Sequence, residues 1–199
     1  MDLPKEWAAR LLARYAEPHR HYHTVAHLSA VLATVDALAA WADRSDLVRL
    51  AAWYHDAVYD PRRCDNEAAS AELARAELAT AGLEPADVGR VAELIMVTAG
   101  QAAPVGDRDA EVLCDADLAI LAAAGPLYDG YVTTVRQEYA HVADDDWRAG
   151  RSAVLRGLLD QPQVFRTQPA QAWEQAARAN LTRELLALGA PSAGATPPR

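Results

Sequence analysis

Apolar residues recur every three to four positions along almost the whole of this 199-residue chain, a spacing that fits helices and little else. Alternating runs of Val, Ile and Thr, which are typical of strands, are scarce. Alanine is abundant and favours helix because it loses no side-chain entropy there. The pattern therefore predicts an all-α protein. Its expected helices cover residues 4–16, 24–43, 46–59, 66–81, 85–99, 109–124, 126–143, 146–160 and 169–188.

The chain shows no internal repeat and no interdomain linker. With 51% hydrophobic residues, it has enough apolar material for one sizeable core. We expect a single domain over residues 1–188. Residues 189–199 are rich in Gly, Ala, Pro and Ser, which predicts a disordered tail.

Charge and cysteine content exclude several classes of protein. The net charge is −9 and Lys5 is the single lysine, which argues against a partner that is nucleic acid or an anionic membrane. Two cysteines are too few for a disulfide scaffold, and the N-terminus lacks the basic-then-apolar pattern of a signal peptide. Asp36 interrupts the longest apolar stretch, so no bilayer span is expected. These features predict a reduced, cytoplasmic protein.

His55 and Asp56 lie side by side at the end of a segment that is apolar on nearly every face. Such a helix is buried, and a carboxylate in a dry interior is costly unless something compensates its charge. Neighbouring helical positions lie about 100° apart, so the two side chains can straddle one ion. The alternative is a core histidine that is hydrogen-bonded to a carboxylate.

Two further polar residues are predicted to face the interior. His27 shares a helical face with Val31, and Asp117 shares one with Leu113. Asp115 lies two positions from Asp117, so we expect it to face outward or to support the site from behind. Two histidines and two aspartates form a plausible nitrogen and oxygen donor set for one divalent metal ion.

The order His27, then His55-Asp56, then Asp117 resembles the H…HD…D signature of the HD superfamily of metal-dependent phosphohydrolases. The resemblance runs from about residue 10 to 187 and is greatest with the short, single-domain branch of predicted phosphohydrolases. The segments that carry it are Tyr22-His23-Thr24, Trp53–Asp60, Asp65–Ser70, Asp115–Leu118, Val135–Tyr139 and Ala177–Leu181. The resemblance implies an HD-domain helical bundle in which His27, His55, Asp56 and Asp117 hold a metal between central helices. It also implies hydrolysis of a phosphate ester.

One departure from the superfamily pattern concerns the number of metal ions. No histidine lies between Asp56 and Asp117, and Gln101 stands where relatives often have histidine. This argues against a dinuclear phosphodiesterase or a di-iron oxygenase and favours a single divalent ion. The sequence leaves Mn, Ni, Co, Zn and Fe open as its identity.

A phosphohydrolase also needs groups that bind phosphate and move protons. In this acidic chain, we expect Arg20, His23 and Arg136 to contact the substrate phosphate. Glu67 is the candidate general acid or base, and its alternative role is to stabilise a helix start.

The predicted function is hydrolysis of a phosphate ester in a small phosphorylated metabolite or nucleotide by a metal-activated water. The alternatives are a non-catalytic HD-fold module that binds a nucleotide or a metal for regulation, and a helical bundle in which the four residues form a hydrogen-bonded cluster. A homo-oligomer through an Ala-rich helix face is compatible with the composition.

Overall fold

The computed structural model describes residues 5–189, and all regular secondary structure in that range is helical, as predicted. Within it, no helix combines the length and the apolar character that a membrane crossing requires. Residues 190–199 of the predicted tail lie outside the described range. The helices are α1 Lys5–Tyr15, α2 Val25–Ala37, α3 Ser45–Tyr54, α4 Asn66–Thr80, α5 Pro85–Thr98, α6 Arg108–Leu118, α7 Gly125–Glu138, α8 Asp144–Leu159 and α9 Glu174–Gly189. Three short 3-10 helices are η1 Ala39–Trp41, η2 Ala119–Ala122 and η3 Ala170–Trp173.

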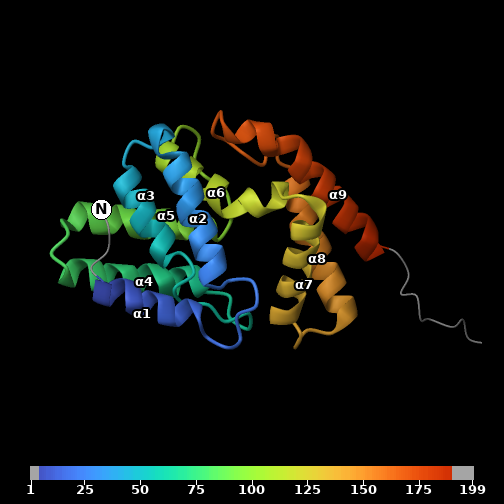
Figure 1. Ribbon diagram of the computed structural model, residues 1–199, viewed down its shortest axis with the longest axis horizontal. Helices are drawn as coiled ribbons and strands as arrows, with labels where there is room; N and C mark the ends of the chain where they lie inside the picture. Colours follow the sequence, from blue (N-terminus) through green and yellow to red (C-terminus); the bar gives the residue numbers. More distant parts are fainter. Residues whose placement is uncertain (1–4, 190–199) are drawn as a thin grey trace, which may run out of the picture.

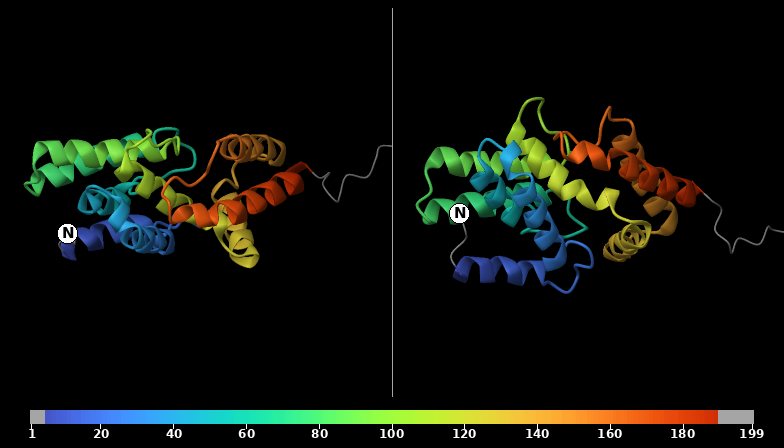
Figure 2. Two further views of the ribbon diagram at one scale, coloured as in Figure 1. Left: turned by 90° about the horizontal axis from the view of Figure 1, so that it is seen from above. Right: turned by 45° about the horizontal axis from the view of Figure 1, so that its top comes forward.

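The helices form two packed groups (Figure 1). In the first, α1 to α6 surround a core that includes Leu28, Leu50 and Leu113. In the second, α7 to α9 pack around Tyr128 and Phe165. Figure 2 shows the same division from two further directions. Because η2 continues directly from α6, the end of α6 marks the junction between the two groups.

Four helices end at least five residues earlier than the sequence predicts. α2 ends at Ala37 rather than 43, α3 at Tyr54 rather than 59, α6 at Leu118 rather than 124, and α7 at Glu138 rather than 143. The end of α3 has a clear tertiary cause, because both backbone polar groups of Val58 bond the hydroxyl of Ser70 on α4. His55 and Asp56 therefore lie in a turn just beyond α3.

Candidate metal site

His27 enters the site from the first turn of α2. Thr24 caps this helix, and its side-chain oxygen accepts a hydrogen bond from the backbone N–H of Ala26 at 3.3 Å. His27 is buried on the side of α2 that also buries Val31. The cap thus fixes the direction in which the His27 ring leaves the helix.

His55 presents one defined ring nitrogen to the site. Its Nδ1 lies 2.7 Å from the carbonyl oxygen of Ala52. A carbonyl oxygen only accepts, so Nδ1 carries the hydrogen and the lone pair of neutral His55 is on Nε2. This orientation by a backbone carbonyl is common among metal-binding histidines.

Arg20 holds the turn that carries His55 and Asp56. Its guanidinium donates to the carbonyl oxygens of His23 (3.1 Å), Asp56 (2.8 Å) and Ala57 (3.4 Å), and to Glu17 (3.2 Å). The Arg20 side chain has no exposed surface. The donors of Arg20 are enclosed and already bonded, so the structure makes Arg20 a support of this turn, and its contact with a substrate phosphate stays a prediction.

Asp117 comes from the end of α6, and Gln101 orients it. Nε2 of Gln101 donates to Oδ2 of Asp117 at 2.5 Å, which leaves Oδ1 facing the histidines. Gln101 has a φ of +49°, the only positive φ of a residue other than glycine within 5–189. Its Oε1 is the one buried side-chain polar atom in that range without a hydrogen-bond partner. A buried orphan acceptor of this kind points to a water or another donor at the site.

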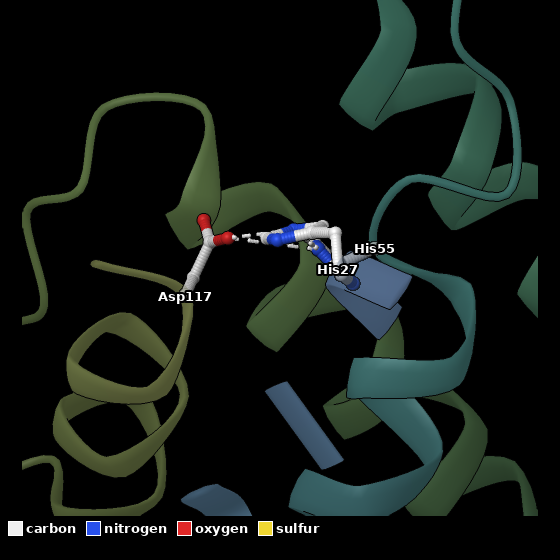
Figure 3. A group of neighbouring side chains, drawn as sticks. All are labelled: His27, His55 and Asp117. Carbon is white, nitrogen blue, oxygen red and sulfur yellow. Dashed lines mark hydrogen bonds and ion pairs between the residues drawn. The ribbon is translucent and has the colours of Figure 1, made fainter. Parts of the chain in front are cut away.

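Three of the four predicted ligands form one group, and the fourth, Asp56, contacts its two histidines. Figure 3 shows His27, His55 and Asp117 directed toward one another, and their ligand atoms all lie within 4.8 Å of each other. Oδ2 of Asp56 reaches both histidines. The contacts are His27 Nε2–His55 Nε2 3.2 Å, His27 Nε2–Asp117 Oδ1 3.2 Å, His55 Nε2–Asp117 Oδ1 3.7 Å, His27 Nε2–Asp56 Oδ2 3.5 Å and His55 Nε2–Asp56 Oδ2 3.1 Å.

These separations suit a divalent metal ion. Bonds of about 2.1 Å in tetrahedral or octahedral geometry place neighbouring donor atoms about 3.0 to 3.4 Å apart. The observed 3.1–3.7 Å lies close to that range. The group of His27, His55 and Asp117 can therefore hold a metal ion, and Oδ2 of Asp56 lies 3.1 and 3.5 Å from its two histidine nitrogens.

The electrostatics of the cluster also favour a cation. Burial by itself lowers the pKa of His27, but hydrogen bonds with Asp117 and Asp56 outweigh it and raise the pKa to about 9. Burial likewise opposes the charge on His55, and the neighbouring Asp56 carboxylate raises its pKa overall. The two carboxylates thus stabilise positive charge at the centre of the cluster, whether it comes from protons or from a metal ion.

His23, a predicted substrate-binding residue, lies beside the cluster. Its ring is stacked on Tyr59 at 4.1 Å and is edge-on to His27 at 5.6 Å between ring centroids. Nδ1 of His23 donates to Oε2 of Glu138 at 2.7 Å. His23 therefore has one nitrogen held by Glu138, and the side chain is 22% exposed.

Glu138 is a site residue that the sequence reasoning missed. Its Oε1 accepts hydrogen bonds from the backbone N–H groups of His21, Tyr22 and His23 at 2.8 to 3.0 Å. Its Oε2 accepts from His23 and from the hydroxyl of Tyr59 at 2.8 Å. The sequence signals were its place in the segment Val135–Tyr139, which resembles the HD superfamily, and its helical face shared with the apolar Val135 and Tyr131.

The Arg136 side chain bonds groups of its own turn. Its guanidinium donates to the carbonyl oxygens of Tyr139 (2.6 Å) and Val142 (3.1 Å) and to the carboxylate of Asp144 (2.7 Å), and it packs on Trp147. Arg136 thus holds the turn between α7 and α8, and its contact with a substrate phosphate stays a prediction.

Two further acidic residues of the sequence analysis, Glu67 and Asp115, differ in what the structure shows of them. Glu67 lies in the first turn of α4 and makes no hydrogen bond or ion pair to another described residue, so its catalytic role stays a prediction. Asp115 is fully buried and does not face outward. Its carboxylate accepts from the backbone N–H groups of Arg166 and Thr167 and from the Thr167 hydroxyl, which ties α6 to the segment before α9.

Comparison of the chain with protein-family models, with curated proteins and with solved structures finds no match. The class of protein is therefore defined by its fold and by the candidate metal site. Over residues 5–189 this is an all-helical protein in which two buried histidines and a partly buried aspartate can hold a metal ion.

Proposed function

We propose that this protein is a metal-dependent phosphohydrolase of the HD type that acts on a small phosphorylated metabolite or nucleotide. The observation that carries the proposal is the group of His27, His55 and Asp117, whose donor atoms could hold one ion, with Oδ2 of Asp56 within 3.5 Å of both histidines. The resemblance of their order to the HD signature supports it. No further donor histidine lies between Asp56 and Asp117, which favours a single ion.

When bound, a divalent ion such as Mn²⁺, Ni²⁺, Co²⁺, Zn²⁺ or Fe²⁺ supplies charge neutralisation for the phosphoryl oxygens and a lower pKa for a water. Residues around the site hold its ligands in position. Gln101 fixes which oxygen of Asp117 faces the cluster, and Arg20 fixes the turn of His55 and Asp56.

His23 is the residue best placed to assist the substrate. Glu138 accepts the hydrogen on Nδ1, so in the protonated ring the Nε2–H is the donor left for a phosphoryl oxygen or a leaving group. Because Tyr59 and Glu138 hold the ring from two sides, it needs no reorganisation when a ligand arrives. In this proposal, His23 binds the phosphate or moves a proton to it.

The alternative function is a non-catalytic module that binds a nucleotide or a metal for regulation. One observation favours it: Arg20 and Arg136, two of the three predicted phosphate contacts, bond the chain's own carbonyl groups. A phosphate at the site then depends on the metal ion and on His23 for its positive partners.

Phosphate release from a broad panel of phosphate esters and nucleotides, measured on Mn²⁺-loaded protein, separates the two functions. The panel compares the wild type with Asp117→Asn and with the matched control Asp129→Asn, whose carboxylate is exposed on α7. We expect at least one ester to be hydrolysed by the wild type and the control, with a loss of about 100-fold or more in Asp117→Asn. Metal binding without release of phosphate from any ester would favour the regulatory module.

A further inference from the structure

A pocket of about 520 Å³ opens beside the candidate metal site. It lies between α2, the end of α6 and α7, at the junction of the two helix groups seen in Figure 1. His27 and Asp117 both form part of its wall. A molecule whose phosphate reaches the candidate metal site therefore has this pocket as adjoining space for the rest of its structure.

The pocket owes its space to short apolar side chains. The lining positions of this kind are Ala26, Ala30, Ala116, Ala119, Ala123 and Gly130. Gly130 lies inside α7, where glycine destabilises a helix by about 1 kcal/mol relative to alanine. A Cβ atom built at Gly130 meets no other atom within 4 Å, so packing does not require glycine there. A longer side chain at this position would project into space that is now open.

Most of the side chains that line the pocket are apolar, and three of its polar side chains bond the protein itself, while His21 and Tyr22 also line it. The side-chain oxygen of Thr24 accepts from Ala26, and the hydroxyl of Thr134 donates to the carbonyl oxygen of Gly130. The hydroxyl of Tyr131 accepts from Arg151. None of the described residues that line the pocket is Lys or Arg.

Such a wall favours an apolar occupant over a sugar. Each hydroxyl of a sugar would lose hydrogen bonds to water on entering the pocket and would not regain all of them from the wall. A buried polar group without a hydrogen-bond partner is unfavourable. An alkyl or aryl group loses only unfavourable contact with water.

We propose that this pocket binds an uncharged alkyl or aryl group of the substrate, whose phosphate lies at the candidate metal site. This inference rests on the proposed phosphohydrolase function. It narrows the substrate class to phosphate esters of apolar alcohols or phenols.

Two variants close the pocket from opposite walls. Gly130→Leu adds a side chain from α7, and Ala30→Leu adds one from α2. Gly157→Leu is the matched control, because Gly157 is also an exposed glycine inside a helix with open space around it and does not line this pocket. Thermal denaturation of each variant establishes that it is folded.

The first measurement tests the pocket without relying on a metal ion. Saturation-transfer NMR with benzyl alcohol, on protein without added metal, detects binding of a neutral aryl group. We expect transfer in the wild type and in Gly157→Leu, and its loss in folded Gly130→Leu and Ala30→Leu. Equal transfer in all four proteins, or none in the wild type, would contradict binding of an aryl group in this pocket, independently of whether the site binds a metal ion.

The second measurement joins the pocket to the candidate metal site. Calorimetry on Mn²⁺-loaded protein compares phenylphosphonate with inorganic phosphate. We expect phenylphosphonate to bind the wild type and Gly157→Leu at least tenfold more tightly, and this preference to vanish in Gly130→Leu. A wild type without the preference would contradict the inference. A preserved preference with no hydrolysis of phenyl phosphate would remove the proposed hydrolase and leave the binding pocket.

Discussion

The carboxylate of Glu138 holds the imidazole of His23 across 115 residues of sequence, with Oε2 2.7 Å from Nδ1. The other oxygen of the same carboxylate accepts the backbone N–H groups of residues 21 to 23. One acidic side chain from α7 thereby fixes the loop that leads into His27. It also links the second group of helices to the candidate site in the first.

The stability of the protein should depend on pH through Glu138. Burial alone raises its pKa, but the hydrogen bond and charge of His23 and the backbone N–H groups outweigh it and lower the pKa from 4.5 to about 2. A lowered pKa gives stability that is present above pH 4.5 and is lost as pH falls toward 2. Urea denaturation should show Glu138→Gln less stable than wild type at pH 6, with the gap about 2 kcal/mol smaller at pH 3.

The matched control for this experiment is Glu72→Gln, whose side chain is 77% exposed. Its stability relative to the wild type should change little between pH 6 and pH 3. An equal difference in stability between Glu138→Gln and the wild type at both pH values would contradict a lowered pKa of Glu138.

Removing Arg20 should weaken both the fold and the candidate site. Arg20→Ala leaves the carbonyl oxygens of Asp56 and Ala57 without their donor and opens a cavity, so we expect a loss of about 3 kcal/mol or more in unfolding free energy. Affinity for Mn²⁺ should fall as well, because the turn of His55 and Asp56 loses its anchor. Arg62→Ala, at an exposed position, should change stability by less than about 0.5 kcal/mol. Equal stability of both variants would contradict this role.

Gln101 should tune metal affinity without being a ligand. Gln101→Ala removes the donor that orients Asp117, and outer contacts of this kind are worth about 10- to 100-fold in metal affinity. We expect a decrease of about tenfold in the affinity for Mn²⁺, measured by competition with a chelating dye. Gln101→Asn, which tolerates a positive φ, controls for the backbone at this position. An unchanged affinity in Gln101→Ala would remove the positioning role.

A bound metal ion should also stabilise the folded protein. A ligand that binds only the native state raises stability by about 2.7 kcal/mol when its concentration is 100 times Kd. The Tm of the wild type and of His141→Asn, a histidine exposed in the turn between α7 and α8, should rise with added Mn²⁺. The Tm of His27→Asn should not respond. A similar rise in all three proteins would indicate binding elsewhere.

The candidate metal ligands can be predicted from the sequence more readily than the residues that hold them in place. His27, His55 and Asp117 stand out because each is a polar residue on an apolar helical face, a pattern that is local and readable. The partners of Arg20 are backbone carbonyl groups 36 and 37 residues away, and carbonyl groups have no sequence signature. The roles of Arg20 and Glu138 therefore depend on tertiary contacts that helical periodicity cannot reveal.

Helix type was predictable and helix ends were less so. The break at Asp60-Pro61 suggests that the third helix stops near residue 59, yet Ser70 bonds Val58 and the helix ends at Tyr54. This difference of a few residues places His55 and Asp56 in a turn, where their side chains are oriented by contacts rather than by helical geometry.

The most direct test of the account is the metal content of the protein, measured by elemental analysis after incubation with Mn²⁺, Ni²⁺, Co²⁺, Zn²⁺ or Fe²⁺ and removal of free ions. The proteins compared are the wild type, Asp56→Ala, Asp117→Asn and the control Asp129→Asn. We predict about one equivalent of metal in the wild type and the control and much less in the other two. No metal in the wild type, or two equivalents, would contradict a single-ion site formed by His27, His55, Asp56 and Asp117.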